Sequence, residues 1–179
     1  MTDETRNPSA VLNLGCGQKR LDGAVNLDRL AAVNPDVVHD IDRFPWPFDE
    51  NQFSEVHAND VIEHCSDVVV TMEEIHRICR NGAVVYITTP HFSSANSFAD
   101  PTHRYHFSYF SFHYFTGEHD FDFYSTKRYR RRQAQIIFHP TVVNKLIWRL
   151  ANHYPQAYEQ RWAWLFPAWF LYFELEVVK

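Results

Sequence analysis

The chain has 179 residues, a mass of 21.2 kDa and a net charge of −5, and this length suits one domain with a single buried core. Hydrophobic residues make up 45% of the sequence and charged residues 22%, a balance that excludes an intrinsically disordered chain. The acidic charge balance, with a pI near 6.1, excludes a general electrostatic attraction to nucleic acid.

The cysteines and the hydropathy pattern indicate a cellular compartment. Cys16, Cys65 and Cys79 are odd in number and lack C-x-x-C spacing, which argues against a disulfide framework or a zinc finger and favours a reducing environment. The polar residues 1–10 resemble neither a signal peptide nor a transit sequence. No run of 18 residues is free of charge or proline, so we expect a cytoplasmic protein without a transmembrane segment.

The first predicted elements are a strand, a glycine turn and a second strand. Residues 11–16 form an apolar run typical of a strand that is buried on both faces of a parallel sheet. Gly15 and Gly17 allow backbone N–H groups to approach a ligand. The second strand, residues 24–28, ends at Asp28, where a carboxylate can accept hydrogen bonds from a ribose diol. The connection is too short for a full crossover helix, so we expect a turn there.

The remaining pattern alternates strands and helices. Further strands are predicted at 37–41, 53–59, 83–88, 128–138 and 170–178, and helices at 66–80 and 140–153. Ser66 suits the N-cap of the first helix, and Asn81-Gly82 suits its end. This order indicates one α/β domain over residues 1–179, with a Rossmann-like, doubly wound, mostly parallel seven-stranded sheet and an antiparallel last strand. Residues 91–126 read as a histidine- and aromatic-rich insertion on the substrate side.

Candidate ligand-binding residues follow the strands, because ligands of open α/β sheets bind beyond the carboxyl ends of the strands. The residues found there are Gly15, Cys16, Gly17, Asp28, Asp40, Asn59, Asp60, His64 and His91. A dinucleotide fingerprint is incomplete, because Arg20 stands at its third glycine and Asp28 lies too close to the turn. A P-loop is absent as well. We therefore expect a nucleoside cofactor with a tail that carries no phosphate.

Five motifs occur in order between residues 11 and 90. They are Leu12-Asn13-Leu14-Gly15-Cys16-Gly17, Asn26-Leu27-Asp28, His39-Asp40-Ile41, Phe44-Pro45-Trp46-Pro47-Phe48 and Asp60-Val61-Ile62-Glu63-His64. In this order they resemble the motifs of class I S-adenosylmethionine-dependent methyltransferases, most closely the small bacterial type 11 methyltransferases. The resemblance implies S-adenosylmethionine as cofactor.

The resemblance also implies roles for single residues. Gly15 and Gly17, with Cys16 between them, would line the methionine part of the cofactor. Asp28 would bind the ribose hydroxyls and Asp40 the adenine amino group, while Asn59 would lie beside the sulfonium. The family usually has an acid where Asn13 stands, which implies a weaker or water-bridged contact with the cofactor's ammonium group.

The histidines after the fifth strand are the candidates for catalysis. His91 and His103 are predicted as general bases, with Asp100 as an orienting group and His64 behind them, because an unperturbed histidine pKa lies near 6.5. A divalent ion bound by His91, Asp100, His103 and His106 is an alternative. Their spacing matches no zinc signature, so we expect no metal ligand.

Two other segments leave alternatives open. The basic run 127–132 suits a charged edge strand, or a contact with phosphate or RNA. The aromatic segment 162–173 suits a peripheral membrane contact, a homodimer interface or burial under the sheet. We expect an O-methyltransferase for a sugar or another small hydroxylated metabolite. The alternatives are an RNA or protein methyltransferase and a non-catalytic, cofactor-binding partner subunit.

Overall fold

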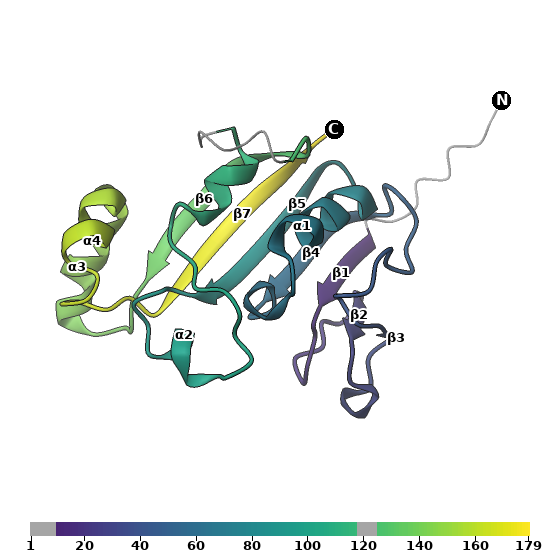
Figure 1. Ribbon diagram of the computed structural model, residues 1–179, viewed down its shortest axis with the longest axis horizontal. Coiled ribbons are helices and arrows are strands. Elements are labelled where there is room, and N and C mark those ends of the chain that lie inside the picture. Colours follow the sequence, from purple (N-terminus) through teal and green to yellow (C-terminus); the bar gives the residue numbers. More distant parts are fainter. Residues whose placement is uncertain (1–9, 118–124) are drawn as a thin grey trace.

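The computed structural model describes residues 10–117 and 125–179, which form one sheet with helices at its faces and at one end (Figure 1). The first nine residues and positions 118–124 of the predicted insertion lie outside the described residues. The strands are β1 (Ala10–Leu14), β2 (Val25–Asp28), β3 (Val37–Val38), β4 (Phe53–Asn59), β5 (Cys79–Pro90), β6 (Arg128–Ile137) and β7 (Phe170–Val178). The helices are α1 (Val68–Ile78), α2 (Asn96–Ala99), α3 (Val142–His153) and α4 (Pro155–Arg161), with short 3-10 helices η1 (Ala31–Val33), η2 (Ile62–His64) and η3 (Ser111–Phe115).

The strand order in the sheet is β3-β2-β1-β4-β5-β7-β6. Strands β1 to β5 pair in parallel, and β7 pairs antiparallel with both β5 and β6. The predicted Rossmann-like sheet with an antiparallel last strand is therefore confirmed. The order reverses between β1 and β4, so a crevice opens beyond the carboxyl ends of these two strands.

The connection from β1 to β2 is a series of turns without a helix, as its length predicts. The longest helix between parallel strands is α1, which joins β4 to β5 and lies across the sheet face in Figure 1. Helices α3 and α4 lie at the other end of the sheet, beyond β6 (Figure 1). None of the helices in residues 10–117 and 125–179 is long and apolar enough to cross a bilayer.

The two faces of the central strands differ in burial. Val56, Val85 and Phe173 are fully buried and belong to the core under α1, where each side chain contributes about 1.5–3 kcal/mol relative to exposure. On the opposite face, His57 stacks on Tyr86 of the neighbouring strand with ring centroids 4.9 Å apart, and both are half-buried. The alternation along β4, β5 and β7 therefore follows the period of two that a strand imposes.

The cap of α1 differs from the prediction. Asp67, not Ser66, is the N-cap, and its carboxylate accepts hydrogen bonds from the N–H groups of Val69 and Val70. The helix ends at Ile78, before the predicted Asn81-Gly82 stop, because the chain enters β5 directly at Cys79. The N–H of Ser66 instead donates to Asp42, which links the start of α1 to the loop after β3.

Candidate functional site

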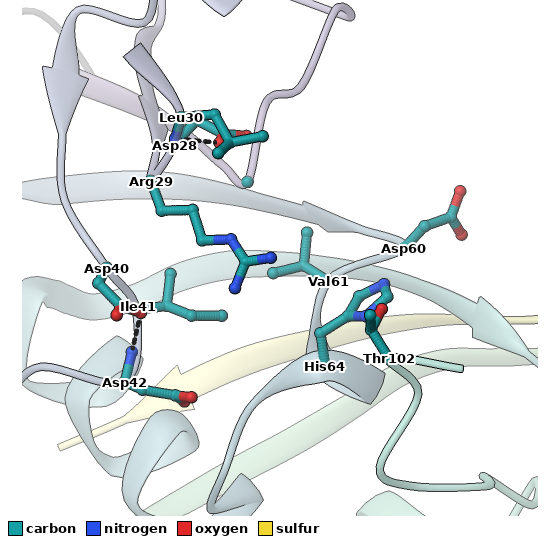
Figure 2. A pocket seen from close by; sticks show the side chains of 11 residues that line it. Asp28, Arg29, Leu30, Asp40, Ile41, Asp42, Asp60, Val61, His64 and Thr102 are labelled. Carbon is teal, nitrogen blue, oxygen red and sulfur yellow. Dashed lines mark hydrogen bonds between the residues drawn. The ribbon is translucent and has the colours of Figure 1, made fainter. Parts of the chain in front are cut away.

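Four strands of the sheet bring their carboxyl-terminal residues to one pocket (Figure 2). The pocket is lined by Gly15, Asp28, Arg29, Leu30, Asp40, Ile41, Asp42, Asp60, Val61, His64 and Thr102. The predicted Gly15, Asp28, Asp40 and His64 thus lie around one space, because parallel strands β1, β2 and β4 end at the same edge.

The glycine loop is held by Asp28. Gly15 and Gly17 have φ values of +60° and +47°, which glycine adopts without the cost that a Cβ brings. The Gly17 N–H donates to Oδ2 of Asp28 over 2.8 Å, and the Leu30 N–H donates to Oδ1 over 2.9 Å. Asp28 therefore joins the loop after β1 to the turn after β2, and it still lines the pocket.

Asn13 and Cys16 support this loop from behind. The buried amide of Asn13 donates to the carbonyl oxygen of Lys19 and to Oδ1 of Asn26, both over 2.9 Å. Cys16 is buried and its N–H donates to the carbonyl oxygen of Leu27, while burial raises the pKa of its thiol. Neither side chain lines the pocket.

The loop after β3 supplies two carboxylates. Oδ1 of Asp40 accepts from the Asp42 N–H over 3.1 Å, as Figure 2 shows. Asp42, which the sequence analysis did not single out, accepts from the Ser66 N–H over 2.7 Å and from Nη1 of Arg104 over 3.3 Å. Asp42 is therefore engaged within the protein, whereas Oδ2 of Asp40 lies 4.0 Å from the exposed Arg43.

The end of β4 presents Asp60 where Asn59 was predicted. Asp60 has a φ of +57°, and this left-handed turn brings its side chain to the pocket (Figure 2). Asn59 is exposed, and its Oδ1 accepts from the Thr88 hydroxyl over 3.3 Å. An acidic residue directly after a strand of the parallel sheet was the available signal for Asp60.

The charge of the pocket favours a cationic ligand. Asp28, Asp40, Asp42 and Asp60 bring four carboxylates to its walls, against the single guanidinium of Arg29. Figure 2 shows the Arg29 side chain extending into the middle of the pocket, towards Val61 and His64. A phosphate group would meet like charge on most sides here, whereas a ligand with a net positive charge is attracted.

A second pocket adjoins the first and shares Asp60 and His64 with it. Its lining residues are Asp60, Glu63, His64, Pro90, Asn96, Ala99, Asp100, Pro101, His103 and Phe170. The loop that carries α2 lies on the same side of the sheet as the ends of β1, β4 and β5 (Figure 1). The predicted Asp100, His103 and His64 are therefore brought together beside the first pocket.

Glu63 is a buried carboxyl group in the wall of the second pocket. Its side chain is 1% exposed, and neither carboxyl oxygen has a hydrogen-bond partner among the described residues. Burial raises the pKa of this carboxyl to about 7, although the Glu63 N–H and the Thr89 hydroxyl lie near enough to oppose the shift. Neither of these two groups reaches Glu63 with hydrogen-bond geometry, and the buried Thr89 hydroxyl has no partner in the described part of the chain.

The rings of His64 and His103 pack edge to face, with centroids 4.6 Å apart and an angle of 66° between the ring planes. Nδ1 of His64 lies 2.9 Å from the Thr102 hydroxyl, which donates to Oδ1 of Asp100 over 2.7 Å. These hydrogen bonds from Thr102 lower the pKa of Asp100, so the carboxylate is charged at neutral pH. Burial, together with the neighbouring His103, lowers the pKa of His64, so this ring is neutral there.

His91, a predicted base, lies outside both pockets. Its side chain is fully buried, and the Ser93 N–H donates to its Nδ1 over 3.1 Å. Nε2 therefore carries the proton and donates to Oε1 of Glu159 on α4 over 3.2 Å. The ring fixes α4 to the end of β5, and a substrate in either pocket has no access to it.

The remaining predicted segments also have defined places. In the aromatic run 107–115, which lies within the predicted insertion, Phe107, Phe112 and Phe115 belong to the core. The basic run lies on the edge strand β6, where Arg130 and Arg132 pair with Glu176. Residues 162–166 are largely exposed apolar side chains, whereas Leu171 and Phe173 are buried within β7.

Comparisons with known proteins agree with this geometry. A family model described as a methyltransferase domain matches residues 18–87. No curated protein sequence matches the chain. An S-adenosylmethionine-dependent methyltransferase from Mesorhizobium loti is 14% identical, with 93% of this chain and 90% of that chain covered and a TM-score of 0.61.

Two further solved structures have the same fold. An S-adenosylmethionine-dependent methyltransferase from Archaeoglobus fulgidus is 13% identical, covers 94% of this chain and 86% of its own, and has a TM-score of 0.64. The [4+2]-cyclase SpnF is 12% identical, covers 95% and 74%, and has a TM-score of 0.59. At these identities the likeness shows the fold, and the cyclase illustrates that one fold serves more than one reaction.

Proposed function

We propose the class of molecule that this chain methylates. By its matching domain model and its fold, the chain belongs to the class I S-adenosylmethionine-dependent methyltransferases. The acceptor is a sugar or another small hydroxylated metabolite, methylated on oxygen. The observation that carries this proposal is the pair of adjoining pockets, one acidic and one lined by histidines, that share Asp60 and His64.

The first pocket suits S-adenosylmethionine. The acidic walls favour its sulfonium and ammonium charges, and the glycine loop leaves room for its methionine end near Gly15. In this arrangement Asp28 accepts hydrogen bonds from the ribose hydroxyls and Asp40 accepts from the adenine amino group. Asp60 takes the place near the sulfonium that the sequence analysis assigned to Asn59.

The second pocket suits the acceptor. S-adenosylmethionine, when bound, supplies a methyl group on a sulfonium, and this carbon is transferred to an acceptor oxygen by in-line displacement. The carbon–sulfur bond breaks as the carbon–oxygen bond forms, and the hydroxyl proton passes to a base in the second pocket. His103 and His64 face that pocket, with Asp100 orienting His64 through Thr102. Positioning of the two reactants accounts for most of the acceleration, and a general base adds about 10²–10⁴-fold.

The alternatives drawn from the sequence have less support. The basic run that suggested an RNA or protein acceptor lies on the edge strand, where Arg130 and Arg132 pair with Glu176 of the same chain. A non-catalytic cofactor-binding subunit would need no neutral histidine beside the cofactor. The histidine-lined pocket therefore favours an enzyme that acts on a small molecule.

Two further features concern the cellular compartment of the enzyme and its contact surface. The three cysteines are all buried and unpaired, which supports a reducing compartment such as the cytoplasm. The exposed apolar side chains of α3 and residues 162–166 support a contact surface, as a homodimer interface or a peripheral membrane contact requires.

Radioactive methyl transfer tests the function directly. Purified protein is incubated with methyl-labelled S-adenosylmethionine and a panel of sugars and small hydroxylated metabolites, and the labelled product is identified. We expect transfer to oxygen of a small acceptor, and about 10²–10⁴-fold slower transfer by His103→Ala with unchanged cofactor affinity. Label that enters only RNA or protein would overturn the acceptor class. Failure of the protein to bind S-adenosylmethionine in calorimetry would overturn the proposal entirely.

A further inference from the structure

We propose that Glu63, His64 and His103 bind a divalent transition-metal ion, and that this ion holds two neighbouring oxygens of the methyl acceptor. The second half of this statement rests on the proposed function, whereas the cation site is a property of the protein alone. The ligand set differs from the one considered from the sequence, in which His91, Asp100 and His106 accompanied His103.

The geometry brings three donor atoms together. One ligand atom from each residue lies within 4.8 Å of the other two. Glu63 and His64 are neighbours on η2, and His103 comes from the loop after α2. The carbonyl oxygen of Glu63 accepts from the N–H groups of Arg104 and Tyr105, over 2.8 and 3.3 Å, and thereby holds this loop against η2.

Hydrogen bonds leave both rings ready to coordinate through Nε2. The Thr102 hydroxyl has one hydrogen, which it gives to Asp100, so towards His64 it acts as an acceptor and Nδ1 of His64 carries the proton. Nδ1 of His103 lies 3.2 Å from the carbonyl oxygen of Ser97, which can only accept. With the proton on Nδ1, Nε2 of each ring carries a lone pair and has no hydrogen-bond partner among the described residues, and each Nδ1 has the outer partner that metal-binding histidines use.

Glu63 supplies the independent observation. A carboxyl group that is 1% exposed and lines a pocket with both oxygens unpartnered, as Glu63 is among the described residues, is costly to bury. A bound cation with two imidazole nitrogens beside it would pair this carboxylate directly. The same cation would explain why two histidine rings converge on a carboxyl group whose oxygens accept no hydrogen bond from them.

The donor set indicates the kind of ion. Two imidazole nitrogens and one carboxylate are the protein ligands of catalytic sites that keep open positions, and they suit zinc, manganese, cobalt or iron(II). With metal–ligand distances of about 2.1 Å, ligand atoms of a tetrahedral site lie about 3.4 Å apart, so binding requires the cluster, whose ligand atoms lie within 4.8 Å of one another, to contract. The open positions face the second pocket, beside Asp60.

The cation would select an acceptor with two adjacent oxygens, as in a vicinal diol of a sugar. Binding of a hydroxyl oxygen to a divalent cation lowers the pKa of that hydroxyl, as it does for bound water. The hydroxyl proton then leaves to water in the open pocket, the carbon–oxygen bond forms and the carbon–sulfur bond breaks. In this arrangement the two histidines act as ligands in place of proton acceptors.

Metal titration of the full chain tests the site without any cofactor. Chelator-treated protein is titrated with Zn²⁺ and Mn²⁺ by calorimetry, and with Co²⁺ by visible absorption, which reports nitrogen and oxygen coordination. We expect one saturable site, lost in Glu63→Gln and His103→Ala. Thr102→Val leaves the three ligands in place but removes the hydroxyl that bonds Nδ1 of His64 and donates to Asp100, and it should weaken binding about 10–100-fold. His106→Ala is the matched control on the same loop and should retain the site, because Nδ1 of His106 bonds Ser97 and the ring lies outside the cluster.

The outcomes separately test the cation site, its role with the acceptor and the proposed function. Calorimetric binding of S-adenosylmethionine by Glu63→Gln shows that the variant is folded, so its loss of metal binding then reports the ligand. The absence of a saturable site in the parent, or equal affinity in parent and Glu63→Gln, would overturn the cation site. Methyl transfer that persists after complete chelation would overturn its role with the acceptor and leave the proposed function standing. Saturable cation binding without methyl transfer to any acceptor would instead overturn the proposed function.

Discussion

Gly15 lies where the backbone turns from β1 into the first pocket, and replacing it by alanine perturbs two features at once. Its φ of +60° costs about 1–2 kcal/mol for a residue with a Cβ. The added Cβ would also lie 2.5 Å from Cγ2 of Val61 and 3.1 Å from Cγ1. Val61 is buried and β-branched, so it cannot turn away freely, and such overpacking costs about 1–3 kcal/mol.

Gly17 is the matched control for this prediction. Its φ is +47°, but an added Cβ would meet nothing within 4 Å. Alanine also restricts the unfolded chain, which returns about 0.4–1 kcal/mol at either position. We therefore expect the free energy of unfolding to fall by about 2–4 kcal/mol in Gly15→Ala and by about 1 kcal/mol in Gly17→Ala.

Urea unfolding followed by circular dichroism measures both variants, with the double variant Gly15→Ala/Val61→Ala closing the cycle. If the contact with Val61 is responsible, the double variant loses about 1–3 kcal/mol less than the sum of the single variants. Gly15→Ala should also weaken S-adenosylmethionine binding, because Val61 lines the pocket and has to move. Equal losses in Gly15→Ala and Gly17→Ala, with an additive cycle, would refute the reasoning.

Three other outcomes are expected. Asp28→Asn should weaken S-adenosylmethionine binding about 10–100-fold in calorimetry, because an amide cannot accept from Gly17, Leu30 and a ribose together; an unchanged affinity would contradict the assigned role. Hydrogen bonds to Asp36, the largest effect coming from Arg20 and the next from Asn26, lower the pKa of its carboxyl from 3.8 to about 2. The stability that this ionised carboxylate contributes is therefore present above pH 3.8 and is lost as the pH falls to about 2. Asp36→Asn should therefore flatten the acid side of the unfolding free energy against pH, and a curve parallel to the parent would speak against it. Leu165→Glu, at a side chain that is 65% exposed, should abolish concentration-dependent dimers in sedimentation velocity; a parent that is monomeric at every concentration would remove the homodimer.

The lining of the first pocket was largely predictable from the sequence. The apolar run before Gly15 and the acids after the next two strands are local patterns, and parallel strands bring their carboxyl ends to one edge by a general rule. Asp28 and Asp40 therefore line one pocket as expected. Asp60 lines this pocket and Asn59 does not, because the chain turns at the left-handed residue Asp60.

The second pocket depended on partners that are distant in the sequence. His91 and His103 look equivalent in the sequence, yet Glu159, 68 positions beyond His91, pairs with its ring in the interior. His103 instead meets Glu63 and His64 because backbone hydrogen bonds join two loops that are about 40 residues apart. Local sequence patterns do not report contacts between side chains that are so far apart in the sequence.

The sequence by itself predicted the α/β class of the sheet, its antiparallel last strand and the acids that gather at one edge of it, because these follow from hydrophobic periodicity, glycine conformation and the handedness of crossovers. Only the tertiary structure decided that His91 is interior and that His103 lines the second pocket. It also decided that the Glu63 carboxyl is buried without a partner beside two imidazole rings. The physical reason is that burial and hydrogen-bond partners of a side chain are set by packing between distant segments, whereas periodicity reports only its own element.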